Sequence, residues 1–194
     1  MAGESYLVVG LGNIGPEYAH TRHNMGFMVL DAWSQASNTS FSTQRYGDLA
    51  VVKIKGRNVY LLKPSTYMNL SGNAVRYYLQ KLPITEDRLI VICDDINLPF
   101  GTLRMRKNGS DGGHNGLKNI AEMIQTQNYA RIRMGVGHDF SQGAQCDYVL
   151  GNLSKEEEEA MENLSKRVIQ GVQDWIFVGA DRAMNVLNTK NAPK

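Results

Sequence analysis

Apolar residues of this chain fall into short runs, separated by longer stretches in which they recur every three or four positions. The short runs are rich in β-branched and aromatic residues and predict strands. They cover residues 6–9, 49–54, 59–62, 89–93, 102–106 and 131–136. The fourth run is apolar throughout, as expected of a strand that is covered on both faces of a sheet. The second and third runs flank Lys55-Gly56-Arg57-Asn58, which predicts a hairpin.

The longer stretches have helical periodicity and predict helices between the strands. These helices begin near residue 25, span residues 74–82 and 116–124, and follow residue 154. Pro83 ends the second of them. Ser154 and Glu157 form a capping box, which predicts a helix start. The apolar stripe after the box is most simply core packing; it consists of Met161, Leu164, Val168, Val172 and Trp175.

Strands and helices alternate along the chain without a linker, an internal repeat or a low-complexity segment. Such alternation predicts an α/β fold, with a mixed, mostly parallel sheet and helices on both faces. A length of 194 residues is close to that of one domain of about 150 residues. With 42% hydrophobic residues the chain can bury a core of its own. We therefore expect a single domain over residues 1–194.

Composition excludes several classes of protein. Two cysteines cannot build a disulfide framework, and Cys93 lies in an apolar run typical of a core strand. No apolar run approaches the roughly 18 residues of a membrane span. The N-terminus lacks the basic segment and the long apolar run of a signal peptide. The sequence therefore predicts a soluble, cytoplasmic protein without membrane contact.

The formal net charge of +2 hides a basic segment. Residues 104–133 contain six basic and two acidic side chains, a net charge of +4. Arg104 and Arg106 alternate with apolar residues in one predicted strand, and Arg131 and Arg133 do so in another. Each pair is therefore expected on one face of its strand. Such a face can bind an anionic partner or can simply be solvated, and charge alone favours the solvated face.

Residues 10–15 match the dinucleotide-binding pattern G-x-G-x-x-G and follow a predicted strand, which makes an NAD-dependent oxidoreductase an alternative. That pattern requires a helix that opens at the glycines. Here residues 16–23 have no apolar periodicity, and the helical pattern begins only at Met25. Asp31, at about the separation of a ribose-binding acid, lies inside that helical pattern. The glycines are better explained by a loop that presents Asn13, Tyr18, Arg22, His23 and Asn24.

Loops between predicted strands and helices carry side chains suited to acid–base chemistry. These loops contain His23, then Asn69, then Asp94 with Asp95, and then His114 with Asn115. Each alone has a structural explanation as a helix cap or a turn former. The chain has no G-x-S-x-G nucleophile elbow and no recognisable metal-ligand spacing. If the loops converge at one sheet edge, a histidine, a carboxylate and amides come together, a set that suits activation of water by a general base.

The motifs around these residues resemble those of bacterial-type peptidyl-tRNA hydrolases in order and spacing, from about residue 6 to residue 188. They are Gly10-Leu11-Gly12-Asn13 with Gly15 and Tyr18, Thr21-Arg22-His23-Asn24, Met68-Asn69-Leu70-Ser71-Gly72, Asp94-Asp95 with Leu98-Pro99 and Gly101, Gly112-Gly113-His114-Asn115-Gly116-Leu117-Lys118, and Arg131 with Arg133, Gly135, Gly137 and His138. No single motif is specific, whereas the ordered set is very specific. The resemblance implies a monomeric α/β enzyme without metal, cofactor or protein partner. It also implies the reaction, hydrolysis of the ester between peptide and tRNA in peptidyl-tRNA released prematurely from ribosomes.

The resemblance further implies a role for each matching residue. His23 is the implied general base, and Asp94 is the implied carboxylate that orients His23 and stabilises its protonated form. The residues implied to hold the substrate are Asn13, Tyr18, Tyr67, Met68, Asn69 and Asn115. Asn13 would favour a blocked amino group over the free ammonium of aminoacyl-tRNA. The basic residues implied to meet tRNA phosphates are Arg104, Arg106, Lys118 and Arg133.

The chain departs from the family pattern at four positions. Ile14 stands where proline is usual, Cys93 and Asn97 stand where histidine and aspartate are common, and Asp111 lies in a stretch that is usually richer in glycine. None of them removes an implied catalytic residue, so we expect effects on substrate affinity alone. A relative with this fold is a non-enzymatic partner in intron splicing in plant organelles, so an RNA-binding protein is the second alternative. The retained site residues and the absence of a transit-peptide-like N-terminus favour the enzyme.

Overall fold

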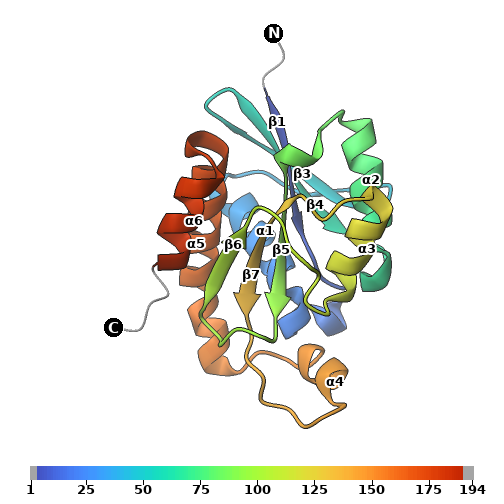
Figure 1. Cartoon of the computed structure of the whole chain (residues 1–194), viewed down its shortest axis with the longest axis vertical. Coiled ribbons are helices and arrows are strands. Elements are labelled where there is room, and N and C mark those ends of the chain that lie inside the picture. The colour runs from blue at the N-terminus through green and yellow to red at the C-terminus, as the bar shows by residue number, and fades with distance from the viewer. Residues whose placement is uncertain (1–3, 190–194) are drawn as a thin grey trace.

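The computed structural model describes residues 4–189, which form a seven-stranded sheet with helices on both faces (Figure 1). The strands are β1 Ser5–Gly10, β2 Ser42–Gln44, β3 Gly47–Ile54, β4 Arg57–Pro64, β5 Leu89–Asp95, β6 Leu103–Arg106 and β7 Ala130–Gly135. The α-helices are α1 Met25–Ala36, α2 Ser71–Lys81, α3 Asn115–Ile124, α4 Gln145–Val149, α5 Lys155–Val178 and α6 Ala180–Thr189. Short 3-10 helices lie at Pro16–Tyr18, Arg22–Asn24, Met68–Leu70 and Glu86–Arg88.

The sheet is parallel in its centre and antiparallel at its edges. Its strand order is β2-β3-β4-β1-β5-β7-β6. Strand β1 pairs in parallel with β4 and β5, and β5 pairs in parallel with β7. The outer strands β2, β3 and β6 pair antiparallel with their neighbours. The predicted mixed, mostly parallel sheet is confirmed, and the carboxyl ends of its four parallel strands meet at one edge.

Two hydrophobic cores lie on opposite faces of this sheet. One contains side chains of α1, α5 and α6, and the other contains side chains of α2 and α3. In Figure 1 the first group of helices lies to the left and behind, and α2 and α3 lie to the right. Along β5, Ile90 and Ile92 belong to the first core, whereas Val91 and Cys93 belong to the second. Residues 89–93 are apolar throughout because both faces of β5 are covered.

Local sequence signals set two of the element boundaries. Strands β3 and β4 form the predicted hairpin, but its turn contains only Lys55 and Gly56, whose φ angles of 48° and 81° are typical of a type I′ turn. The capping box at the start of α5 is formed in both directions between Ser154 and Glu157. The stripe that follows it is buried, as expected of core packing. Within residues 4–189, no helix has the length and apolar character needed to span a membrane.

Candidate active site

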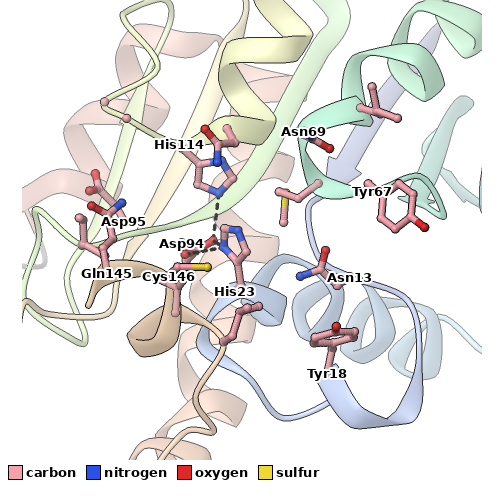
Figure 2. Close-up of a pocket in the computed structure, with 18 of the residues that line it drawn as sticks. Asn13, Tyr18, His23, Tyr67, Asn69, Asp94, Asp95, His114, Gln145 and Cys146 are labelled. Carbon is pink, nitrogen blue, oxygen red and sulfur yellow. Dashed lines mark hydrogen bonds and ion pairs between the residues drawn. The ribbon is translucent and has the colours of Figure 1, made fainter. Parts of the chain in front are cut away.

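A cleft of about 1430 Å³ opens at the carboxyl edge of the parallel strands. Its walls come from the loop after β1, the loop between β4 and α2, the end of β5, the start of α3 and the segment containing α4 (Figure 2). Nine of the residues implied by the sequence line it: Asn13, Tyr18, His23, Tyr67, Met68, Asn69, Asp94, Asn115 and Arg133. Arg104, Arg106 and Lys118 do not line the cleft. The fold therefore brings together every implied catalytic and substrate-holding residue.

Asp94 is the most deeply buried charged group of the cleft, and it accepts hydrogen bonds from two imidazoles. It lies at the end of β5 and is 3% exposed. His23 Nδ1 donates to its two oxygens at 2.8 and 2.9 Å, and His114 Nε2 donates at 3.0 Å (Figure 2). An ionised carboxylate can only accept, so both imidazole nitrogens carry a proton. Although burial raises the pKa of Asp94, the charges and hydrogen bonds of the two histidines outweigh burial and lower it below its usual range.

The tautomer of His114 is fixed by the helix that follows it. Its Nδ1 accepts the backbone N–H groups of Gly116 at 3.1 Å and Leu117 at 3.4 Å, so His114 is the N-cap of α3. The proton of the neutral imidazole must then reside on Nε2, which donates to Asp94. Asn115, whose structural alternative in the sequence was a helix cap, is instead the first residue of α3. The sequence placed His114 among the loop side chains suited to acid–base chemistry but did not predict its bond to Asp94, because this contact joins the start of α3 to the end of β5.

His23 keeps one ring nitrogen available to the cleft. Because Nδ1 donates to Asp94, a neutral His23 has its lone pair on Nε2, which has no hydrogen-bond partner among residues 4–189. Its side chain is 14% exposed. Burial alone would lower its pKa, but the negative charge and hydrogen bonds of Asp94 outweigh burial, and the pKa is raised. An imidazole of this kind can accept a proton from a water molecule in the cleft.

The three side chains His23, Asp94 and His114 also bring their ligand-type atoms within 4.8 Å of one another, the arrangement of a possible metal site. A metal ligand needs a nitrogen lone pair directed at the ion. Here Nδ1 of His23 and Nε2 of His114 use their protons to bind Asp94, and the helix cap prevents His114 from shifting its proton. The donor set therefore fits a hydrogen-bonded triad better than a metal site. We call these three residues the imidazole–carboxylate triad.

The segment that carries His23 is also held by contacts with the segment before α5 and with the start of α5. Arg22 makes three of these contacts. Its backbone N–H donates to Gly151 O at 3.0 Å, and its guanidinium pairs with Glu157 at 3.2 Å and lies over the ring of Tyr148, 4.4 Å from the ring centroid. Leu153 N also donates to His20 O at 2.9 Å. The start of α5 thus supports the 3-10 helix in which His23 lies, and Glu157 serves both the capping box and this support.

Asn24 fixes the backbone of Asn13 at the mouth of the cleft. Its buried amide accepts from Asn13 N at 2.8 Å and donates to Asn13 O at 2.9 Å. The Asn13 side chain is left directed to the cleft, on the same side as Tyr18, Tyr67 and Asn69 (Figure 2). The sequence analysis identified Asn24 only as a residue that the glycine loop presents. It did not predict the hydrogen bonds to Asn13, because the two residues are eleven positions apart and meet only in the folded loop.

Asn69 and Asn115 are exposed side chains at the starts of α2 and α3. Asn69 is not the N-cap of α2, which is Leu70, and neither asparagine amide makes a hydrogen bond within residues 4–189. Between them, Met68 is buried at the base of the cleft, whereas Tyr67 is 80% exposed at its rim. Amide groups without protein partners beside an imidazole can bind a carbonyl or hydroxyl of a bound molecule.

The structure divides the predicted basic residues into two groups. In the antiparallel pair β6–β7, Arg104 lies opposite Arg133 and Arg106 lies opposite Arg131, so the four share one face as expected. Arg104 and Arg106 are exposed, as is Lys118 on α3. We call these three residues the basic rim. Arg133 instead lines the cleft, with Asp95 at 3.8 Å.

The expectation that the arginine face of β7 is solvated is wrong for Arg131. It is 1% exposed and lies over the ring of Tyr129 at 4.1 Å. Its guanidinium donates to the backbone oxygens of Ser110, Gln127 and Tyr129, and burial lowers its pKa. The alternation of arginines with apolar residues placed it on the correct face, but the loop before α3 covers that face.

Comparisons with known proteins bear on this geometry. The family model described as peptidyl-tRNA hydrolase matches residues 7–194. The chain belongs to the peptidyl-tRNA hydrolase family. A peptidyl-tRNA hydrolase of Bacteroides fragilis is 53% identical over 185 residues, which are 95% of this chain and 99% of the relative. A relative of that name in Cytophaga hutchinsonii is 52% identical over 95% of this chain and 98% of its own. The crystal structure of peptidyl-tRNA hydrolase from Acinetobacter baumannii is similar with a TM-score of 0.89 and 32% identity, covering 97% of this chain and 96% of that one.

Membership of the peptidyl-tRNA hydrolase family and the packing of the first loop count against the dinucleotide alternative. A Cβ on Gly10 would lie 2.3 Å from the backbone oxygen of Gly26, so this glycine allows α1 to pack directly on the end of β1. The helix itself starts at Met25, well beyond the glycine motif. The α-helix that the dinucleotide pattern requires directly after its glycines is therefore replaced by the three-residue 3-10 helix Pro16–Tyr18. The relatives carry the name of a hydrolase, which favours the enzyme over the non-enzymatic RNA-binding alternative.

The four departures from the pattern of peptidyl-tRNA hydrolases lie outside the triad. Ile14 is 52% exposed on the wall of the cleft. Cys93 is fully buried, as predicted, and burial raises the pKa of its thiol. The backbone N–H of Asn97 donates to Asp95 at 2.8 Å, and Asp111 accepts the backbone N–H of Gly113 at 2.8 Å. Only Ile14 is placed where it can contact a molecule in the cleft.

Proposed function

We propose that this chain hydrolyses the ester that joins the peptide to tRNA in peptidyl-tRNA released prematurely from ribosomes, with His23 as general base. The observation that carries this assignment is the triad. The Asp94 carboxylate accepts hydrogen bonds from an N–H group of each of two imidazoles. Because His23 donates through Nδ1, its Nε2 can accept a proton in the cleft. Family membership supports the substrate class, and the position of the triad in the cleft supports the choice of residues.

The reaction on this geometry needs no covalent intermediate. Nε2 of His23 removes a proton from water as the water oxygen attacks the ester carbonyl carbon, and Asp94 stabilises the imidazolium that forms. The tetrahedral intermediate collapses by breaking the bond to the ribose oxygen of the tRNA, and that oxygen receives the proton from His23. The products are a peptide with a free carboxylate and tRNA with a free hydroxyl.

The remaining cleft residues divide the work of binding. We assign Asn13 and Asn69 to the peptide and its carbonyl, with Asn13 favouring a blocked amino group. Asn115 is assigned to the tRNA end, and Tyr18, Tyr67 and Met68 line the cleft around the terminal nucleotide and the peptide. The amides of Asn69 and Asn115 suit these assignments because they make no hydrogen bond within residues 4–189. The Asn13 amide suits them because Asn24 holds the backbone that carries it.

Binding of the tRNA body is assigned to basic side chains. Arg104, Arg106, Lys118 and Arg133 would meet phosphates, because cationic side chains that contact phosphates supply the sequence-independent part of nucleic-acid affinity. The basic rim has the exposure that such contacts require, whereas Arg133 would act from the wall of the cleft. We further propose that residues 1–194 act as one domain, as a monomer in the cytoplasm.

A release assay tests this function directly. Purified protein is incubated with peptidyl-tRNA, free tRNA and peptide are measured, and binding of NAD is measured alongside. We expect release of both products, no NAD binding, and loss of release in His23→Ala. Binding of peptidyl-tRNA without hydrolysis would support the non-enzymatic RNA-binding alternative instead.

A further inference from the structure

The turn between β2 and β3 forms the end of the cleft farthest from β6 and β7. It consists of Arg45 and Tyr46, and Tyr46 lines the cleft. Tyr46 has a φ of 66°, in the left-handed region that glycine or asparagine adopts at lower cost than a bulky side chain. Strained backbone of this kind is often found where a side chain has a function. The ring of Tyr46 packs edge-on against Tyr77, with the ring centroids 5.3 Å apart, and against the second hydrophobic core, so aromatic packing supports the turn.

The cluster around this turn carries a positive charge without an acidic partner. Arg45 is exposed, and its guanidinium lies over the rings of Tyr46 at 5.0 Å and Tyr77 at 5.5 Å. Among residues 4–189, no carboxylate forms an ion pair with it. The turn is nevertheless held in place, because Ser65 N donates to Tyr46 O and the Tyr78 hydroxyl donates to Arg45 O. A positioned, unpaired guanidinium above aromatic rings is suited to bind a carboxylate.

Strand order indicates which part of the substrate reaches this cluster. The triad lies at the end of β5, the basic rim on β6 and α3, and the Arg45–Tyr46 turn beyond β3 on the other side. A linear substrate whose RNA contacts β6 must carry its peptide toward β3. From β5 to β3 there are three strand intervals, or about 14 Å at about 4.8 Å each. An extended peptide covers that distance in about four residues at about 3.4 Å per residue.

We propose that Arg45 and Tyr46 form a peptide subsite about four residues from the ester, at which an acidic side chain is preferred. This proposal rests on the proposed function, because it assigns one end of the same cleft to the peptide. Arg45 pairs with the carboxylate of the bound side chain, and the ring of Tyr46 packs against its aliphatic part. The subsite contributes to binding only when the peptide is long enough to reach it.

The test compares peptide lengths and charges on one tRNA. The substrates are an N-acetylated single-residue ester and N-acetylated five-residue esters with alanine, glutamate or lysine at the fourth residue from the tRNA. For the wild type we expect kcat/KM to be about three- to fivefold higher with glutamate than with lysine, as for an exposed ion pair. Arg45→Glu should invert that order and leave the single-residue ester unchanged. Tyr46→Asn, which suits the left-handed backbone, should retain the fold and lower kcat/KM only for five-residue esters.

A matched control is available at the other end of the same sheet. Lys55 is also an exposed cation with positive φ at a hairpin turn, and it lies over the ring of Phe177 at 5.2 Å, away from the cleft. Lys55→Glu should leave all ratios at their wild-type values. If Arg45→Glu weakens the single-residue ester as much as the five-residue esters, the turn binds RNA and the proposal is wrong. If it changes no ratio, the turn is solvated surface and the proposal is equally wrong. In both cases hydrolysis of the single-residue ester still tests the proposed function by itself.

Discussion

The imidazole–carboxylate triad and the basic rim are both assigned to one substrate, yet they are built in opposite ways. The Asp94 carboxylate is buried and bonded to two imidazoles, and each imidazole is fixed by its own segment. The rim side chains Arg104, Arg106 and Lys118 are exposed and lie on the surface of β6 and α3. A buried charge network is positioned before substrate arrives, whereas exposed cations keep their freedom and their hydration.

This contrast predicts how each region contributes to the rate. Preorganised groups lower the barrier of the chemical step and therefore determine kcat. Exposed cations attract phosphates, so they determine KM and make it depend on salt. Changes in the triad should accordingly be insensitive to the length of the RNA, and changes in the rim should be insensitive to pH. Each prediction below tests one side of this division.

The largest effect is expected from removal of the base. His23→Ala should lower kcat by about 10²–10⁴, the usual contribution of a general base, while affinity for tRNA and far-UV circular dichroism stay unchanged. His20→Ala is the matched control, since His20 is an exposed neighbour whose imidazole pairs with Glu158 at 2.5 Å. Turnover of His23→Ala within a few-fold of the wild type would exclude His23 as the base.

Removal of the charge on Asp94 should be the next largest effect. Asp94→Asn keeps the size of the side chain but removes the negative charge that raises the pKa of His23. Burial then acts unopposed and lowers that pKa, so the acidic limb of the kcat–pH profile should move to lower pH while the maximal kcat falls. The measurement is the pH–rate profile of the variant beside that of the wild type.

Asp95→Asn is the control for that substitution, because Asp95 adjoins Asp94 in β5 but bonds to Asn97 N and pairs with Arg133. It should leave the acidic limb in place and change kcat much less. An equal loss in both variants, or the reverse order, would assign the orienting role to Asp95.

Changes in the basic rim should act on binding alone. Arg104→Glu and Arg106→Glu should raise KM for full-length peptidyl-tRNA and flatten its salt dependence by about one unit of log–log slope per lost phosphate contact. A short substrate that carries only the 3′ end should be unaffected, and kcat should not change. Lys166→Glu, an exposed charge reversal on α5, is the control. Equal weakening of long and short substrates, or of neither, would show that tRNA does not lie along β6.

The smallest effect is expected from the support behind the triad. Ser154→Ala removes one half of the capping box and should lower the free energy of unfolding by about 1 kcal/mol. Glu157 retains its ion pair with Arg22, so kcat should stay within about twofold of the wild type. Thermal unfolding and turnover are measured on the same preparation, with Ser154→Thr as the conservative variant. A large loss of kcat would mean that the cap, rather than Asp94, positions His23.

Several features of the fold were predictable because their causes are local in the sequence. Alternation and helical spacing predicted strands β1 and β3 to β7, helices α1, α2, α3 and α5, and the mixed, mostly parallel sheet, whereas the short elements β2 and α4 and the helix α6 were not predicted. The capping box between Ser154 and Glu157 is present as expected. The ordered motifs predicted the family. They also selected the residues that the structure collects in one cleft, because loops after parallel strands end at the same edge of a sheet.

Other features depend on contacts between distant segments and could not be predicted from the sequence. The bond of His114 to Asp94 joins the start of α3 to the end of β5, and the hydrogen bonds between Asn24 and Asn13 span the first loop. Arg131 in β7 is covered by the loop before α3, whose Ser110 accepts a hydrogen bond from it. A periodic pattern specifies which face a side chain takes, but it does not specify what covers that face. Hydrogen-bond partners and burial set the protonation and the charge of each group, and both are properties of the packed tertiary structure rather than of the residue itself.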